Sequence, residues 1–410
     1  MTTNILLFSG GRGTKNLLNA SIENIKECEF NLNIIVNGLD DGASTGRIRY
    51  LLNEETHGIS DFLKVIVSLS QETHLVEAFN RRFPFYNDIE DERKTEENLK
   101  EFISGEAPLE IINNISLEDA QISIIKSGIK VFIEYFETNS IKLSLSDFKI
   151  GNIIFATEII KSGYNFSKAI DSFCKIMQID KFGVKIIESC ETPAYLCGIL
   201  KQGIFLPNEA SVVLSRTSDY IEDIYQLDKS LTGEEIREIC SLEKDQKKKY
   251  LSSIETSFFA SNKALNAIRE SDVIVFGAGT PFSSLLPSLS IKGMYDSIAS
   301  NNCPKILIAN LKKETENFYS VNQLIKDVIK FLSRSTNDYA DPKLMVNHLI
   351  VAKDIFKNLD ENHIPYDTDK ILEEFPWMKI IEANILDSKN IYHHDGQKLK
   401  DVILKIGNEY

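Results

Sequence analysis

Residues 33–49, NIIVNGLDDGASTGRIR, indicate the fold class of the chain. They begin with an apolar, β-branched run at 34–36 that is typical of a buried strand, and they continue into a polar loop. In an open α/β sheet, ligands bind beyond the carboxyl ends of the strands. We therefore expect a phosphorylated ligand at this loop.

Two neighbouring aspartates, Asp40 and Asp41, are the most chemically suggestive feature of this loop. Their carboxylates could hold Mg²⁺ or hydrogen-bond a ribose or substrate hydroxyl. The alternative is an Asx turn in which one aspartate caps the next helix. The glycines, hydroxyls and cations around the pair favour ligand binding. They are Asn37, Gly42, Ser44, Thr45, Gly46, Arg47 and Arg49.

A similar unit lies near the start of the sequence. An apolar strand at 4–8 (NILLF) runs into SGGRGT at 9–14, and the apolar residues that follow keep helical spacing. Glycine-loop amides can approach a phosphate closely, and the dipole of the next helix favours negative charge. A tight turn alone is the alternative. The expected phosphate contacts are Gly10, Gly11, Gly13 and Thr14.

Two standard nucleotide motifs fit this loop poorly. The GxGxxG pattern would start at Gly11 and Gly13 but meets Asn16 instead of its third glycine, and GxxxxGK[ST] is absent. An NAD-dependent oxidoreductase is therefore the weakest function considered.

A third loop of this kind, GAGTPFSS at 277–284, follows a strand at 272–276. It offers two glycines and three hydroxyls before a helix, although a turn with a hydroxyl cap is the alternative. Two asparagines are further candidate ligand contacts. Asn310 directly follows a predicted strand at 305–309. Asn152 lies near the start of a predicted helix at 149–162, where capping of the helix is its alternative role. The expected contacts in the third loop are Gly277, Gly279, Thr280, Ser283 and Ser284.

The candidate parallel strands begin near residues 4, 32, 272, 305, 348 and 379. With helices between them they predict a doubly wound, mainly parallel, Rossmann-like α/β sheet of about six strands. Residues 1–70 and 265–410 are predicted to form this core. A largely helical insertion is expected at 71–264, with a small β subregion at 184–187, 195–200 and 211–214 and a polar, charged stretch at 218–250. The glycine loops at 9–14 and 277–284 are expected to meet at the topological switch.

Composition excludes several classes of function. The 410 residues are 43% hydrophobic and 26% charged, as in soluble globular proteins. The net charge of −14 argues against nucleic-acid binding, although it allows a local cationic pocket. We expect a cytoplasmic protein without membrane attachment, because neither a signal peptide nor a long apolar run is evident. Scattered cysteines and histidines disfavour structural zinc.

Seven sequence blocks occur in a specific order along nearly the whole chain. They lie at 9–14 (SGGRGT), 40–49 (DDGASTGRIR), 81–83 (RRF), 151–152 (GN), 191–193 (ETP), 277–289 (GAGTPFSSLLPSL) and 393–395 (HHD). Together they resemble the 2-phospho-L-lactate transferase and gluconeogenesis-factor family (CofD/YvcK type), and more closely its gluconeogenesis-factor branch. Residues 58–62 (GISDF) and Phe148 depart from that branch, where PGDIRN-like residues and a histidine are usual.

The resemblance implies a bound nucleotide diphosphate derivative, such as a UDP-sugar or a GDP-linked donor. The leading expectation is a Mg²⁺-dependent enzyme that transfers a phosphoester group to an acceptor hydroxyl and releases a nucleoside monophosphate. Asp40 and Asp41 are its expected catalytic and metal-binding residues. The alternative is a non-catalytic regulator that binds a nucleotide sugar. The oligomeric state stays open, with a homodimer as one candidate.

Overall fold

The computed structural model describes residues 2–9, 11–25, 30–52, 56–141, 143–215, 220–313, 320–353 and 363–410. The chain divides into two compact units, which are Met1–Asp40 with Phe182–Tyr410, and Asp41–Lys181. The sequence placed the boundaries at 70 and 265 instead. The difference arises because residues 184–188 join the main sheet and residues 195–254 fold within the first unit.

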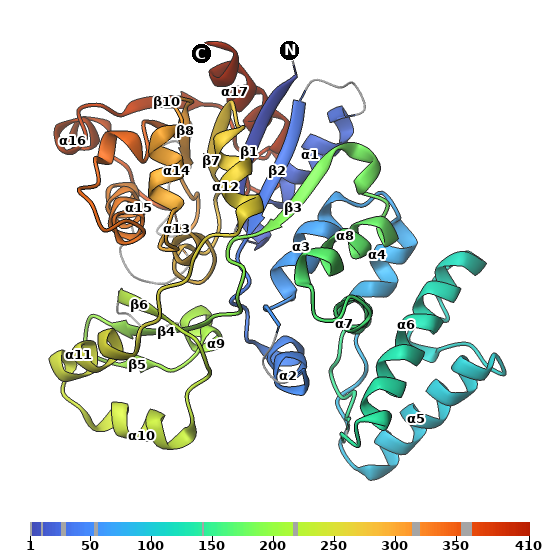
Figure 1. The fold of residues 1–410 in the computed structure, drawn as a ribbon. Coiled ribbons are helices and arrows are strands. Elements are labelled where there is room, and N and C mark those ends of the chain that lie inside the picture. Colours follow the sequence, from blue (N-terminus) through green and yellow to red (C-terminus); the bar gives the residue numbers. More distant parts are fainter. Residues whose placement is uncertain are drawn as a thin grey trace. The chain divides into compact units, whose positions relative to one another are not determined.

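The first unit is built on a seven-stranded sheet in the order β10-β9-β8-β7-β1-β2-β3, in which all neighbouring strands are parallel (Figure 1). The predicted doubly wound α/β class is confirmed, and all six predicted strands are present. The strands are β1 (Thr3–Ser9), β2 (Phe30–Val36), β3 (Val184–Glu188), β7 (Val273–Phe276), β8 (Lys305–Ile308), β9 (His348–Ala352) and β10 (Lys379–Ala383).

The order of the strands places the topological switch between β1 and β7. From β1 the chain adds β2 and β3 on one side, and it later adds β7 to β10 on the other. The central strands are apolar on both faces because helices cover both faces of such a sheet. Leu6, Ile34 and Ile274, for example, are fully buried.

Helices surround this sheet, with α1 and α17 packed against each other (Figure 1). The helical segments of the first unit outside the small sheet are η1 (Gly11–Thr14), α1 (Lys15–Ile25), α12 (Asn262–Arg269), η4 (Pro281–Leu285), α13 (Leu286–Leu289), α14 (Met294–Ser300), α15 (Val321–Arg334), η5 (Pro342–Leu344), α16 (Thr368–Glu374) and α17 (Gly396–Asn408). The short η3 (Asp180–Phe182) lies at the boundary of the two units.

The first unit also contains a three-stranded antiparallel sheet in the order β5-β4-β6. Its buried residues form a hydrophobic core with residues of two flanking helices. Its elements are β4 (Tyr195–Leu200), β5 (Phe205–Leu206), α9 (Glu209–Leu214), β6 (Ile221–Leu227), α10 (Gly233–Ser241) and α11 (Lys244–Ile254).

Two predictions for this region were wrong, and one strand was not predicted. The predicted strand at 184–187 belongs to the main sheet as β3, where it pairs with β2. The predicted strand at 211–214 is part of helix α9, because the Asn208 side chain caps the helix by accepting from the Ser211 amide. Strand β6 lies within the polar, charged stretch at 218–250, where no strand was predicted.

The second unit is mainly helical, and its described residues also include an isolated antiparallel bridge between Arg82 and Lys149. Aromatic side chains fill its core, and the Phe155 ring stacks on Phe166 and Phe173 at 5.9 and 4.7 Å between centroids. Its helices are α2 (Ala43–Leu51), α3 (Ser60–Leu69), α4 (Thr73–Asn80), α5 (Ile89–Ser104), η2 (Glu110–Ile112), α6 (Asp119–Thr138), α7 (Ile150–Lys161) and α8 (Phe166–Ile176). In the described parts of both units, every helix is too short or too polar to span a membrane.

Candidate functional site

The loop after β1 is closed by a hydrogen bond between two hydroxyls. Ser9 Oγ and Thr14 Oγ1 lie 2.7 Å apart, and both side chains are buried. The bond joins the end of the strand to η1, which leads into α1. The chain therefore turns tightly at the carboxyl edge of the sheet. Gly10, one of the expected phosphate contacts, lies outside the described residues.

The loops after β1 and β7 touch each other. A Cβ atom at Gly13 would lie 2.1 Å from the Ala278 carbonyl oxygen, and one at Gly277 would lie 2.5 Å from Thr14 Cγ2. Neither position has room for a larger residue without movement of the backbone or of its neighbour. Gly13 is nevertheless exposed to solvent. The two glycine loops therefore meet at the switch point, as the sequence predicted.

The loop after β7 continues into a π-helical segment. The amides of Ser284 and Leu285 donate to the Thr280 carbonyl oxygen over 3.1 and 3.4 Å, and η4 then passes directly into α13. Single π-helical turns are rare and occur frequently at functional sites. Ser283 and Ser284 are buried here, and Thr280 is partly exposed.

Two asparagines from other strand ends hold this loop. Asn37 Nδ2 donates to the Ser283 carbonyl oxygen over 2.8 Å, and Asn310 Nδ2 donates to the Gly279 carbonyl oxygen over 2.8 Å. Asn37 follows β2, and Asn310 follows β8. The structure therefore brings these predicted residues together, and it shows that both side chains support the loop itself.

His394 is a supporting residue to which sequence reasoning gave no role. Its Nε2 lies 3.2 Å from the Ala309 carbonyl oxygen, next to Asn310, and its carbonyl oxygen accepts from Asn16 Nδ2 over 2.8 Å. Burial lowers the pKa of His394 to about 4, so the ring is neutral near pH 7. The HHD block was the only sequence signal for this residue, and it did not reveal these distant partners.

Asp40 and Asp41 both lie in the segment that follows β2, and both side chains are half-buried. Asp40 is the last residue of the first unit, and Asp41 is the first residue of the second. Among the described residues, no three or more His, Cys, Asp or Glu side chains gather as a metal site. Zinc needs at least three protein ligands, whereas Mg²⁺ is often held by one or two carboxylates with substrate phosphates and water. The carboxylate oxygens of the aspartate pair are of the kind that Mg²⁺ prefers.

Within the second unit, α2 begins directly after Gly42. The amides of Thr45 and Gly46 donate to the Gly42 carbonyl oxygen over 3.0 and 3.3 Å. The first turn contains no acidic residue, so the helix dipole there favours an anion. A Cβ atom at Gly46 would lie 2.4 Å from the Asp41 carbonyl oxygen. Glycine at position 46 thus allows the first turn of α2 to lie close to the backbone of Asp41.

Asn152 and Ser44 form a buried pair in the second unit. Asn152 Nδ2 donates to Ser44 Oγ over 2.9 Å. The capping role considered for Asn152 is wrong, because Lys149 is the N-cap of α7 and Asn152 lies inside the helix. Asn152 Oδ1 is buried and has no hydrogen-bond partner among the described residues.

Arg47 is placed against an aromatic ring. Its guanidinium carbon lies 4.4 Å from the centroid of the Phe148 ring, and its NH2 group donates to the Ser146 carbonyl oxygen. Burial lowers the pKa of Arg47, while the carboxylate of Asp147 acts in the opposite direction. The group stays cationic, since arginine does not lose its proton in proteins. Phe148, which departs from the family pattern, thus provides the surface on which Arg47 lies.

These features define a doubly wound α/β protein with two glycine loops in contact at its topological switch. The model of the family described as 2-phospho-L-lactate transferase CofD matches residues 5–386. The chain therefore belongs to this family, as the sequence blocks suggested.

Relatives of similar length carry another name. A gluconeogenesis factor of Listeria monocytogenes is 21% identical over 403 residues, which cover 98% of this chain and 94% of the relative. A gluconeogenesis factor of Halalkalibacterium halodurans is 19% identical over 411 residues, which cover 98% and 96%. The crystal structure of the UPF0052 family protein BH3568 from Bacillus halodurans has a TM-score of 0.64 at 18% identity, and the match covers 98% of this chain and 99% of that one. This likeness shows the shared fold.

Proposed function

We propose that the first unit binds a nucleotide diphosphate derivative, with its phosphates against the loops after β1 and β7. The contact between Gly13 and Ala278 supports this proposal, because the backbones of both loops meet there at the edge of the sheet. Backbone amides and helix dipoles bind phosphate without a basic surface. This mode of binding suits a chain with a net charge of −14.

We infer that the bound derivative is a donor in a transfer reaction. The oxygen of an acceptor hydroxyl attacks the phosphorus distal to the nucleoside, and a new P–O bond forms. The P–O bond to the nucleoside monophosphate breaks, and this product leaves with the electron pair. The carboxylate of Asp40 or Asp41 accepts the hydroxyl proton.

Asp40 and Asp41 would also hold Mg²⁺ together with the phosphates of the ligand. The ion would supply neutralisation of the charge that develops on the phosphate oxygens. Amides of the two loops would add hydrogen bonds to the same oxygens.

The second candidate function is regulatory and non-catalytic: the protein binds a nucleotide sugar and releases it chemically unchanged. Its support is the similarity to proteins named gluconeogenesis factor, which extends over 98% of this chain. In this function the same loops hold the diphosphate, and no bond is broken.

A ligand screen with product analysis tests both functions. The unfolding temperature is measured with UDP-, GDP- and CDP-linked compounds and Mg²⁺. Each stabilising compound is then incubated with the protein and a panel of hydroxyl acceptors, and the products are analysed. If the protein is a transferase, the wild type should release a nucleoside monophosphate and Asp41→Asn should release none. Asp401→Asn is the control, because the Asp401 side chain is 60% exposed, and it should behave like the wild type. Intact recovery with every acceptor supports the regulator. If no nucleotide stabilises the protein, both proposals are wrong.

A further inference from the structure

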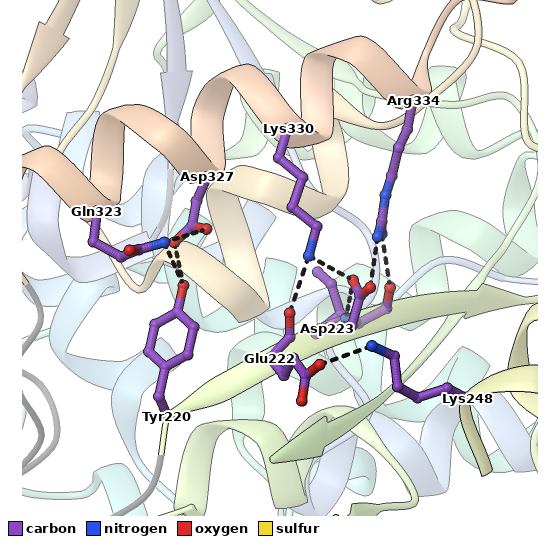
Figure 2. A network of polar contacts seen from close by, with 9 residues as sticks. Tyr220, Glu222, Asp223, Lys248, Gln323, Asp327, Lys330 and Arg334 are labelled. Carbon is purple, nitrogen blue, oxygen red and sulfur yellow. Dashed lines mark hydrogen bonds and ion pairs between the residues drawn. The ribbon is translucent and has the colours of Figure 1, made fainter. Parts of the chain in front are cut away.

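One side of helix α15 faces strand β6 of the three-stranded sheet through polar side chains (Figure 2). The spacing of three or four residues places these side chains along one stripe of the helix. They are Gln323, Asp327, Lys330 and Arg334.

At one end of this stripe, Tyr220 reaches a buried carboxylate. The Tyr220 hydroxyl donates to Asp327 Oδ2 over 2.6 Å and accepts from Gln323 Nε2 over 3.2 Å (Figure 2). Gln323 Nε2 also donates to Asp327 Oδ1 over 3.1 Å. Burial and the Asp327 charge raise the pKa of Tyr220, so the phenol stays protonated and keeps its donor.

At the other end, two cations of α15 bind the start of β6. Arg334 NH2 lies 2.6 Å from Asp223 Oδ2, and Lys330 Nζ lies 3.4 Å from Asp223 Oδ1. Lys330 also donates to the Glu222 carbonyl oxygen over 3.0 Å. The small sheet therefore docks on α15 through charges and hydrogen bonds. Polar interfaces of this kind inside a chain allow relative motion more readily than apolar ones.

The ring of Tyr220 contacts the loop after β7. Its centroid lies 5.6 Å from that of Phe282, with the ring planes at 81°. Phe282 is the second residue of η4, and its ring also meets Phe331 of α15 edge-on, at 6.4 Å. Farther along β6, Gln226 Nε2 donates to the Pro287 carbonyl oxygen over 2.7 Å. Strand β6 and Tyr220, the residue that precedes it, thus hold the segment after β7 at two points.

The residue next to Phe282 is Ser283, whose carbonyl oxygen accepts from Asn37. Consecutive residues of the loop are therefore held by two different elements, Phe282 by the residue that precedes β6 and Ser283 by the residue that follows β2. A change in the docking of the small sheet acts on Phe282 directly. That change then reaches the backbone at which the phosphates are proposed to bind.

We propose that Tyr220 is a positioning residue that couples docking of the three-stranded sheet on α15 to the conformation of the loop after β7. Phosphate binding by the loop and docking of the sheet then stabilise each other, because a coupling between two equilibria acts equally in both directions. The coupling to phosphate rests on the proposed function. The contacts between Tyr220, Phe282 and Asp327 do not.

Hydrogen–deuterium exchange of the protein without ligand tests the coupling itself. The matched variants are Tyr220→Leu and Tyr220→Phe, which both lose the hydroxyl but differ in the aromatic ring. Tyr225→Leu serves as the control, because Tyr225 lies in the small sheet's own hydrophobic core. We expect Tyr220→Leu to raise amide exchange at 280–289 about two- to tenfold, the range that an edge-to-face aromatic contact supports. Tyr220→Phe should stay close to the wild type.

Three exchange results would overturn the coupling through the ring. They are unchanged exchange in Tyr220→Leu, equal exchange in the Leu and Phe variants, and the same increase in the Tyr225→Leu control. The second of these, if exchange rises in both variants, would assign the effect on the loop to the lost hydroxyl and not to the ring.

Titration with UDP, GDP and CDP then tests the link to phosphate. The nucleotide that binds the wild type should bind Tyr220→Leu about two- to tenfold more weakly and Tyr220→Phe with nearly wild-type affinity. Saturation with it should slow amide exchange in β6. Equal affinity in all variants would overturn the link. If none of the three binds the wild type, the proposed function fails, while the exchange comparison still decides the coupling of sheet and loop.

Discussion

The side-chain amide of Asn37 donates to the carbonyl oxygen of Ser283 over 2.8 Å. The strands that precede these two residues, β2 and β7, are not neighbours, because β1 lies between them. The hydrogen bond therefore spans the carboxyl end of β1, where the first glycine loop begins. The ends of β2 and β7 are joined in this way across the end of β1, at the proposed phosphate site.

Removal of this bond should destabilise the fold. Asn37 is buried, so Asn37→Ala should lower the free energy of unfolding by about 1–3 kcal/mol, as expected when a buried carbonyl loses its donor. Urea denaturation measures this quantity. Asn31 is the matched control, since it lies on β2, the strand that Asn37 follows, but is exposed, and its side chain donates to Asn4 Oδ1 over 2.9 Å. Equal losses in Asn37→Ala and Asn31→Ala would contradict the special role of Asn37.

Contact between the glycine loops should make Gly13 irreplaceable. A methyl group there would meet the Ala278 carbonyl oxygen at 2.1 Å, so Gly13→Ala should cost about 1–3 kcal/mol of stability and abolish nucleotide binding. Gly233, at the start of α10, has open space around it, and Gly233→Ala should be neutral or slightly stabilising. Thermal unfolding and nucleotide titration of both variants check this. A fully stable and binding-competent Gly13→Ala would show that the loops are farther apart.

The main sheet could be predicted because its central strands are apolar runs buried on both faces. Strand β6, IEDIYQL, was missed because Glu222 and Asp223 interrupt its apolar residues. Their partners, Lys248 and Arg334, are distant in sequence. Helix α9 was mistaken for a strand because its β-branched residues outweighed the capping signal of Asn208. Strand β3 was recognised as a strand, but an apolar run does not by itself reveal the sheet in which it pairs.

The candidate site could be predicted only as a set of loops. The glycine positions follow from local patterns, and their contact follows from the strand order of doubly wound sheets. The detailed roles depend on partners that no local pattern indicates. Asn37, for example, binds a carbonyl group 246 residues away. The ring of His394 reaches a carbonyl group 85 residues away.

Stability should fall in acid partly through His394. Burial lowers its pKa to about 4 in the folded protein, whereas an unfolded histidine titrates near 6.5. Between these pH values the unfolded chain binds more protons than the folded protein, so the free energy of unfolding rises with pH. The contribution of His394 is therefore lost as the pH falls from 6.5 toward 4. The contribution of the ring is about 3 kcal/mol.

The variant His394→Gln should show a flatter pH dependence over this range, measured by urea denaturation at several pH values. His348, whose pKa burial also lowers to about 4, remains in both proteins as a shared background. Parallel curves for wild type and variant would show that His394 does not titrate with a lowered pKa.

The buried pair of Asn152 and Ser44 should show energetic coupling. Each alanine variant should destabilise the protein by about 1–3 kcal/mol, because each leaves the other polar group buried without this partner. The double variant should cost less than the sum of the two single variants, by about 1 kcal/mol. A double-mutant cycle by chemical denaturation measures this coupling. Additive losses would show that the 2.9 Å contact contributes nothing.

The central claim is that the loops after β1 and β7 form the phosphate site. A crystal structure of the protein grown with UDP, GDP or CDP derivatives and Mg²⁺ tests it most directly. We predict that phosphate oxygens lie within about 3.2 Å of backbone N–H groups in residues 11–14 and 278–280, because the Gly277 amide already donates to the Phe8 carbonyl oxygen over 3.0 Å. A nucleotide whose diphosphate binds away from both loops would contradict the account.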